Sequence, residues 1–77
     1  MNQKEVPRAE LLNSIPSSRY RNLLENTDPP KQGDIVNLDQ GFTSQDGQAM
    51  VLVYCNDEKG TSRYEAEVYE SELGPNL

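Results

Sequence analysis

The chain is most apolar over one short run of residues, Met50-Val51-Leu52-Val53-Tyr54-Cys55. Side chains alternate between the two faces of a β-strand, so an extended conformation makes both faces of this run apolar. A strand that is buried on both faces lies inside a sheet and needs a cover on each side. The sequence therefore predicts a central strand over residues 50–55, with Cys55 as a buried structural thiol.

Two further strands are expected, over residues 34–38 and 64–69. In the first, Val36 and Leu38 share one face, and in the second apolar and polar residues alternate, which suits one face to a core and the other to water. Asp46-Gly47 is typical of a type I′ hairpin turn, and residues 56–60 supply a second turn. The residues expected to form the core of this meander are Val36, Leu38, Val51, Leu52, Val53, Tyr64, Ala66 and Val68.

The N-terminal part of the chain has a helical pattern instead. Pro7 suits the first position of a helix, because its missing N–H would be unpaired there in any case. A first helix is expected over residues 7–14, and Pro16 ends it. A second helix is expected to begin at Ser17 or Ser18 and to run to about residue 25. The residues on the apolar faces of these two helices are Leu11, Leu12, Ile15, Tyr20, Leu23 and Leu24.

The predicted fold class is α+β, with two short N-terminal helices followed by a small, strongly twisted antiparallel β-meander. The chain is expected to be one folding unit, in which a helical arm (1–32) precedes an antiparallel β domain (33–77). Helices this short are not stable alone in water. We therefore expect the arm to pack on the sheet and to cover one face of its central strand.

The order of motifs in the second part of the chain carries a resemblance. It opens with Gly33-Asp34-Ile35-Val36 and passes through two hairpins to the Tyr-Glu-Ala-Glu-Val run that starts at Tyr64. Ser71-Glu72-Leu73 follows as a single turn. Residues 33–73 thereby resemble a small SH3-like β-barrel. This resemblance implies a barrel or partial barrel that acts as a protein-interaction module or as an accessory subunit of a larger complex.

Composition excludes several classes of function. No apolar run approaches the length of a membrane span, and the first residues have no apolar signal region. The 77 residues contain one cysteine and no histidine, so an internal disulfide, Cys–His catalysis and structural zinc are excluded within one chain. We expect no enzyme activity, no cofactor and no metal. A small domain without disulfides is typical of a reducing compartment, and we expect the cytoplasm.

Charge is divided unevenly along the chain. Residues 1–32 carry a net charge of +1 and residues 33–77 a net charge of −7, which sum to the −6 of the whole chain. An acidic domain repels phosphate groups, so neither direct nucleic-acid binding nor binding to an anionic membrane is expected. A protein with a basic surface is the partner that this charge favours.

The candidate binding residues lie at the end of the last predicted strand. Glu65, Glu67 and Tyr69 share its solvent face, and Glu70 and Glu72 lie at its margin. A partner's arginine can stack on such a ring and pair with such carboxylates. The function predicted first is therefore a non-enzymatic interaction module. The alternative is an acidic inhibitor or nucleic-acid mimic that blocks a basic site on another protein.

Two other groups of acidic residues are candidates for calcium binding and for acid–base catalysis. Asn56, Asp57 and Glu58 present clustered oxygens of the kind that calcium prefers. The spacing of a calcium-binding loop is absent from the sequence, and an ordinary hairpin tip is expected. The alternating glutamates of residues 64–72 are near enough to form an acid–base pair, but solvent-facing acids also suit a half-exposed strand. No catalytic residue is therefore assigned.

Overall fold

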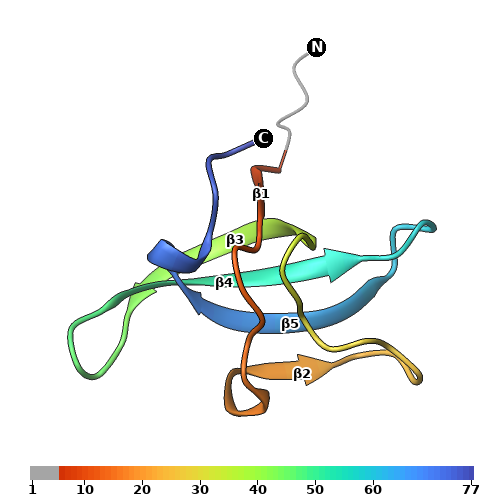
Figure 1. The fold of residues 1–77 in the computed structure, drawn as a ribbon, viewed down its shortest axis with the longest axis horizontal. Helices are drawn as coiled ribbons and strands as arrows, with labels where there is room; N and C mark the ends of the chain where they lie inside the picture. Colours follow the sequence, from red (N-terminus) through yellow and green to blue (C-terminus); the bar gives the residue numbers. More distant parts are fainter. Residues whose placement is uncertain (1–5) are drawn as a thin grey trace.

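The structure is a computed structural model that describes residues 6–77. It forms one antiparallel sheet in the order β1-β3-β4-β5-β2 (Figure 1). The strands are β1 (Arg8–Glu10), β2 (Tyr20–Asn22), β3 (Ile35–Thr43), β4 (Ala49–Asn56) and β5 (Ser62–Tyr69). Two 3-10 turns, η1 (Ser17–Arg19) and η2 (Glu70–Glu72), are the helical elements of the described residues. No helix among them is long and apolar enough to cross a membrane.

The antiparallel meander is confirmed, and β4 lies between β3 and β5 as predicted. Val53 faces Ala66 across the β4–β5 ladder, and both side chains are buried. Val36 and Val68 complete this part of the core, while Leu38 and Val51 pack at its margin. Leu52 points to the other face of the sheet, where it is half-buried. Cys55 is a buried free thiol, as expected.

The α+β prediction is wrong, because the described chain is all-β. Residues 8–10 form a strand that pairs with β3 rather than the first predicted helix. Ala9 and Leu11, two positions apart, are fully buried, whereas Leu12 remains 47% exposed. A helix would have buried Leu11 and Leu12 on one stripe. The extended form buries alternate residues and gains main-chain hydrogen bonds along β3. The few hydrogen bonds within a one- or two-turn helix are less stabilising than these.

The second predicted helix is also wrong. Its start is the single 3-10 turn η1, after which Tyr20–Asn22 pairs with β5 as the three-residue strand β2. Tyr20 lies opposite Ala66, at the edge of the core. Leu23 and Leu24, expected on a buried helical face, are 42% and 36% exposed. The open edge of β5 thus determines the conformation of this segment.

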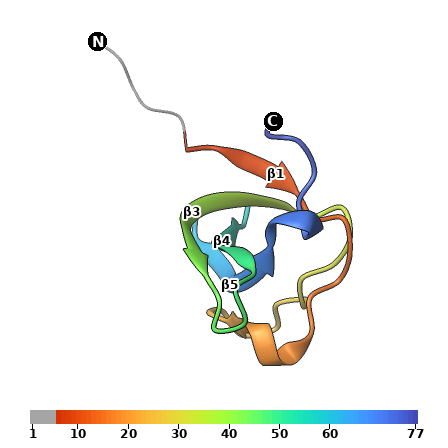
Figure 2. The same cartoon turned by 90° about the vertical axis from the view of Figure 1, so that its left-hand side faces the viewer.

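The N-terminal region covers the face of β4 that carries Val53 and Cys55, whereas the opposite face, which carries Leu52 and Tyr54, stays half-buried rather than covered as predicted. The sheet curls, and residues 11–16 and 29–34, which form no helix, run across its open side (Figure 2). Ile15 and Pro30 are buried there, and the Ile15 N–H donates to the Pro30 carbonyl at 3.4 Å. The cover of this face is therefore supplied by the predicted part of the chain, in an irregular rather than a helical conformation.

The C-terminal segment returns to the first strand. Leu73 forms an antiparallel bridge with Leu11, and the Leu12 N–H donates to the Glu72 carbonyl at 2.9 Å. Figures 1 and 2 both show this segment beside β1, at the end of the sheet opposite β2. The edge of the sheet at β1 is thereby covered.

The first hairpin turn is different from the predicted type I′ turn. Such a turn needs positive φ at both central residues, but at this tip only Gly47 has positive φ, at 85°. Its N–H donates to the Ser44 carbonyl at 3.0 Å, and the Ser44 N–H donates to the Gln48 carbonyl at 2.9 Å. This is a type I turn followed by a left-handed glycine, the usual three-residue hairpin loop.

Candidate interaction face

The face of β4 and β5 that points away from the core brings acidic and apolar side chains together. The register places Leu52 opposite Glu67 and Tyr54 opposite Glu65. Tyr69 lies on the same face at the end of β5, because strand residues two apart share a face. We call Leu52, Tyr54, Glu65, Glu67 and Tyr69 the outer face. Its two tyrosines and its leucine are half-buried, and Glu67 is exposed.

An arginine from the N-terminal segment occupies one end of this face. Arg19 donates from Nη1 to Glu72 Oε1 at 2.8 Å and from Nη2 to Glu72 Oε2 at 3.1 Å. Its Cζ atom lies 4.7 Å from the centre of the Tyr69 ring. Nη1 also donates to the Glu67 carbonyl at 3.1 Å. One guanidinium therefore joins η1, β5 and η2.

Glu72 is held firmly in its charged form. The Arg19 guanidinium, which donates to both carboxylate oxygens, lowers the pKa of Glu72 to about 2 despite partial burial. Asn13 Nδ2 donates to Oε2 at 2.9 Å, and the Tyr69 N–H donates to Oε1 at 2.8 Å. These donors fill both carboxylate oxygens of Glu72, and its side chain is only 13% exposed. Glu72 is therefore engaged in contacts within the protein and is not accessible to a partner.

Arg21 of β2 pairs with Glu65 of β5 in the same region. The Nη2–Oε1 distance is 2.6 Å, and the two residues lie opposite each other in the β2–β5 ladder. The Arg21 side chain is 73% exposed and that of Glu65 is 37% exposed. An ion pair so open to water contributes little to stability. Glu65 therefore remains within reach of a partner, unlike Glu72.

A shallow groove of about 260 Å³ lies between these two arginines. Ala66 and Tyr20 turn their side chains toward the core and leave a hollow between the neighbouring outward side chains. The residues around the groove are Arg19, Tyr20, Arg21, Leu52, Glu65, Ala66 and Glu67. Within residues 6–77 the Glu67 carboxylate makes no ion pair. The groove therefore has an apolar wall and one carboxylate available to a ligand.

The structure brings most of the predicted binding residues together. Glu65, Glu67 and Tyr69 share the outer face, and Glu70 is exposed beside it at the start of η2. Glu72 points back to Arg19. Sequence reasoning missed Arg19 and Arg21 at this site, because both had been assigned to a helix. No signal within the sequence links residues 19 and 72, which are 53 positions apart.

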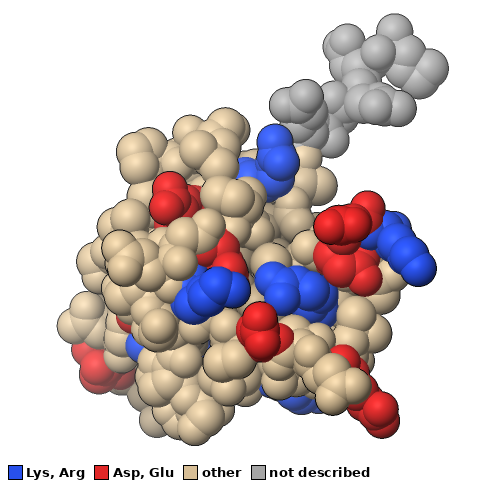
Figure 3. All heavy atoms as spheres, turned by 45° about the vertical axis from the view of Figure 1, so that its right-hand side comes forward, with Lys and Arg blue, Asp and Glu red and all other residues tan. Residues whose placement is uncertain are grey.

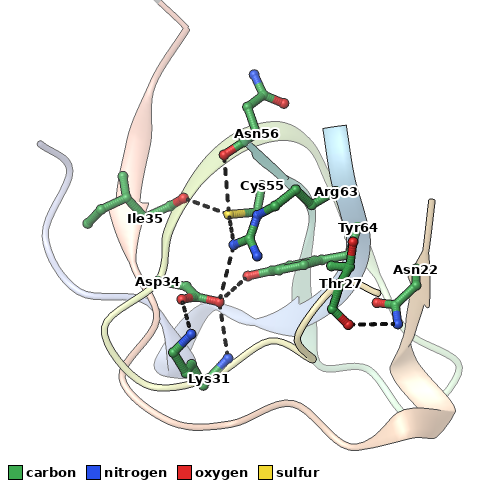
Figure 4. Close-up of polar contacts among 9 residues, drawn as sticks. All are labelled: Asn22, Thr27, Lys31, Asp34, Ile35, Cys55, Asn56, Arg63 and Tyr64. Carbon is green, nitrogen blue, oxygen red and sulfur yellow. Dashed lines mark hydrogen bonds and ion pairs between the residues drawn. The ribbon is translucent and has the colours of Figure 1, made fainter. Parts of the chain in front are cut away.

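A second polar cluster lies at the other end of the core (Figure 4). The Tyr64 hydroxyl donates to Asp34 Oδ2 at 2.9 Å, and Lys31 Nζ lies 3.5 Å from Asp34 Oδ1. Arg63 Nη2 donates to Cys55 Sγ at 3.0 Å. Burial, with the bond to Asp34, raises the pKa of Tyr64, so its phenol stays protonated at neutral pH. The cluster joins the residues just before β3 to the end of β4 and the start of β5.

The acidic hairpin tip after β4 has the role expected of it. Asp57 Oδ1 accepts the N–H groups of Lys59 and Thr61, both at 2.9 Å. Its carboxylate therefore stabilises the turn itself. In the part of the chain that the structure describes, no three Cys, Asp or Glu side chains gather closely enough to hold a metal ion.

Comparison of the chain with protein-family models, with curated proteins and with solved structures finds no match.

Proposed function

We propose that this protein is a non-enzymatic interaction module, of SH3-like character, which binds a basic segment of another protein through its outer face. The observation that carries this proposal is the groove, where an apolar wall at Leu52 lies beside the carboxylate of Glu67, which makes no ion pair within residues 6–77. Such a site suits a side chain with an apolar stem and a cationic end. A reducing compartment such as the cytoplasm accords with the free thiol of Cys55.

Contacts within the molecule support a cationic ligand. Arg19 stacks on Tyr69 and forms a bidentate pair with Glu72, which is the chemistry expected of a partner's arginine on an aromatic, acidic surface. Glu67 and Glu70, both exposed, lie next to this arrangement without an ion pair among residues 6–77. They are the carboxylates left for a partner.

The distribution of charge favours the module over the acidic mimic. A nucleic-acid mimic needs an array of carboxylates uninterrupted by cations, as phosphates are along a nucleic acid. On the surface in Figure 3, basic and acidic side chains are interspersed. Arg19 and Arg21 line the groove together with Glu65 and Glu67. Half-buried Leu52 and Tyr54 beside the acids also suit a protein partner better than a charge mimic.

The proposal is tested by capture of partners from an extract of the native cells at two salt concentrations. The double variant Glu65→Lys, Glu67→Lys should recover several-fold less of a partner than the wild type at low salt. Wild-type recovery should itself fall as salt rises, because exposed charges are screened beyond about 8 Å at physiological ionic strength. The loss should lie mainly in the association rate.

The matched control is the double variant Glu25→Lys, Asp28→Lys, which changes net charge equally in the exposed loop between β2 and β3. It should retain most of the wild-type recovery at each salt concentration. A loss equal to that of the outer-face variant would show that net charge alone attracts the partner. Equal recovery by all three proteins at both salt concentrations would remove the outer-face carboxylates from binding.

A further inference from the structure

The two edges of the sheet are unlike. At the β1 edge, the C-terminal segment supplies main-chain partners: the Gly74 N–H donates to the Glu10 carbonyl at 2.9 Å, and the Leu77 N–H donates to the Arg8 carbonyl at 2.8 Å. At the other edge, β2 pairs with β5 and with no other strand of residues 6–77. An unpaired edge strand presents a row of N–H and C=O groups on which another strand can form.

The hydrogen bonds around β2 show which of its groups face outward. The Leu23 N–H donates to the Arg63 carbonyl at 2.8 Å, and the Arg19 side chain donates to the Glu67 carbonyl at 3.1 Å. Residues 63 and 67 of β5 therefore direct their carbonyls toward β2, and residue 65 does the same by alternation along the strand. Arg21 is the register partner of residue 65, so the main-chain groups of Arg21 bond to β5 rather than facing outward.

Tyr20 and Asn22 then direct their main-chain groups away from β5, because adjacent residues of a strand alternate in this respect. No main-chain bond from the turns, loops or termini of the described chain reaches either residue. In the described part of the chain no further strand lies beyond β2 on this side, where Figure 1 shows only the turn η1 beside its start. Leu23 and Leu24 follow at once, 42% and 36% exposed, and add apolar surface beside the open edge.

A second copy of the chain fits this edge poorly in the register that uses all of β2. Two β2 strands related by a twofold axis and paired over their whole length would place Arg21 opposite its own symmetry mate, and like charges directly opposite each other destabilise a strand pair. An added strand from another protein can instead place an acidic residue opposite Arg21, whose side chain is 73% exposed and therefore accessible. A guanidinium has donors enough for such a residue as well as for Glu65.

We propose that β2 accepts an extended segment of another protein as a sixth strand, with a carboxylate opposite Arg21 and apolar residues on either side. In such strand addition, main-chain hydrogen bonds between the two strands provide the affinity, and contacts of alternate side chains of the added strand provide the specificity. This surface adjoins the outer face, because Tyr20 and Arg21 also line the groove, but it binds through the main-chain edge of β2, and its ligand carries the opposite charge at the point of contact. The inference therefore goes beyond the proposed function and does not depend on it.

The test uses the capped peptide Ac-Thr-Val-Glu-Val-Thr-NH2 as a probe of the whole protein. Its binding should slow amide hydrogen exchange at Tyr20 and Asn22. Asn22→Pro removes one outward N–H and no bond to β5, a substitution that edge strands tolerate, and it should weaken binding about tenfold. Asn22→Ala retains the N–H and should bind as the wild type does.

A second probe keeps the test independent of how Asn22→Pro folds. Methylation of the peptide nitrogens that would face β2 should weaken binding to the wild type by at least about tenfold. A peptide without methylation, in which lysine replaces the glutamate, should also bind the wild type more weakly than the original peptide does. The variant Arg21→Glu should restore binding of this lysine peptide. Equal binding of the methylated peptide would overturn the proposal. Unchanged exchange at both amides, or concentration-dependent dimerisation that protects them without peptide, would also overturn it.

Discussion

Residues 6–34 and residues 35–69 acquire their conformations in different ways. The second region is three long strands whose alternating side chains specify one face for the core. The first region contains only two three-residue strands and one 3-10 turn. Its buried side chains are Ala9, Leu11, Ile15 and Pro30. The meander thus has two unpaired strand edges and an uncovered core face. The N-terminal region adopts the conformation that pairs with those edges and covers that face.

The comparison shows that local pattern is reliable where a segment can form structure with its sequence neighbours. Hairpins of the meander pair strands that are close in sequence, and their turns set the register. β1 and β2 instead pair with strands of the meander that lie much farther along the chain. The N-terminal region should therefore depend on the meander for its structure, and three predictions test this dependence.

The largest effect is expected at the centre of the meander. Val53 is fully buried in the central strand β4. Val53→Asp should abolish cooperative folding, because an unpaired buried charge costs several kcal/mol and a domain this small has only about 5 kcal/mol of stability. Thermal unfolding followed by circular dichroism measures this. A cooperative transition in the variant would show that β4 is not essential to the core.

A smaller effect distinguishes the strand from the predicted helix in the N-terminal region. Leu11→Ala should destabilise the protein by about 3 kcal/mol, because it leaves a cavity at a fully buried side chain. Leu12→Ala should cost no more than about 0.5 kcal/mol, because that side chain is 47% exposed. Urea unfolding of both variants gives the two values. Equal losses would support the helix, in which both leucines share one apolar stripe.

Sequence reasoning identified the meander because its signal is local and repeated. Val36, Val53, Ala66 and Val68 could be placed in the core from alternation alone. In the N-terminal region the same few apolar residues fit two periods. Leu11, Leu12 and Ile15 match a short helix, whereas Ala9 and Leu11 match a strand. Only the free edge of β3, which is a feature of the tertiary structure, decides between them.

The candidate site divides in the same way. Alternation placed Glu65, Glu67 and Tyr69 on one face, because those residues belong to a single strand. The contact of Arg19 with Glu72 was beyond sequence reasoning, since it joins two 3-10 turns that meet only after the chain has folded. The chemistry expected of a basic partner, an arginine on an aromatic and acidic surface, is thus already present once within the molecule.

The smallest effect concerns that contact between the two regions. Glu72→Gln removes the charge that pairs with Arg19 and should destabilise the protein by about 1–2 kcal/mol at pH 7, the usual range for a charge-assisted bidentate pair. The same substitution at the exposed neighbour Glu70, which makes no ion pair among residues 6–77, should change stability by less than about 0.5 kcal/mol. Urea unfolding at a series of pH values measures both.

The pH dependence identifies the charge as the cause. Because the pKa of Glu72 is lowered from its usual 4.5 to about 2 in the folded protein, the carboxylate favours folding at any pH above 4.5. This contribution is lost as the pH falls from 4.5 through about 2 and the folded state takes up the proton. The stability difference between wild type and Glu72→Gln should therefore be constant above pH 4.5 and shrink below it. A difference that stayed the same down to pH 2 would mean that shape, rather than charge, joins the N-terminal region to the end of the meander.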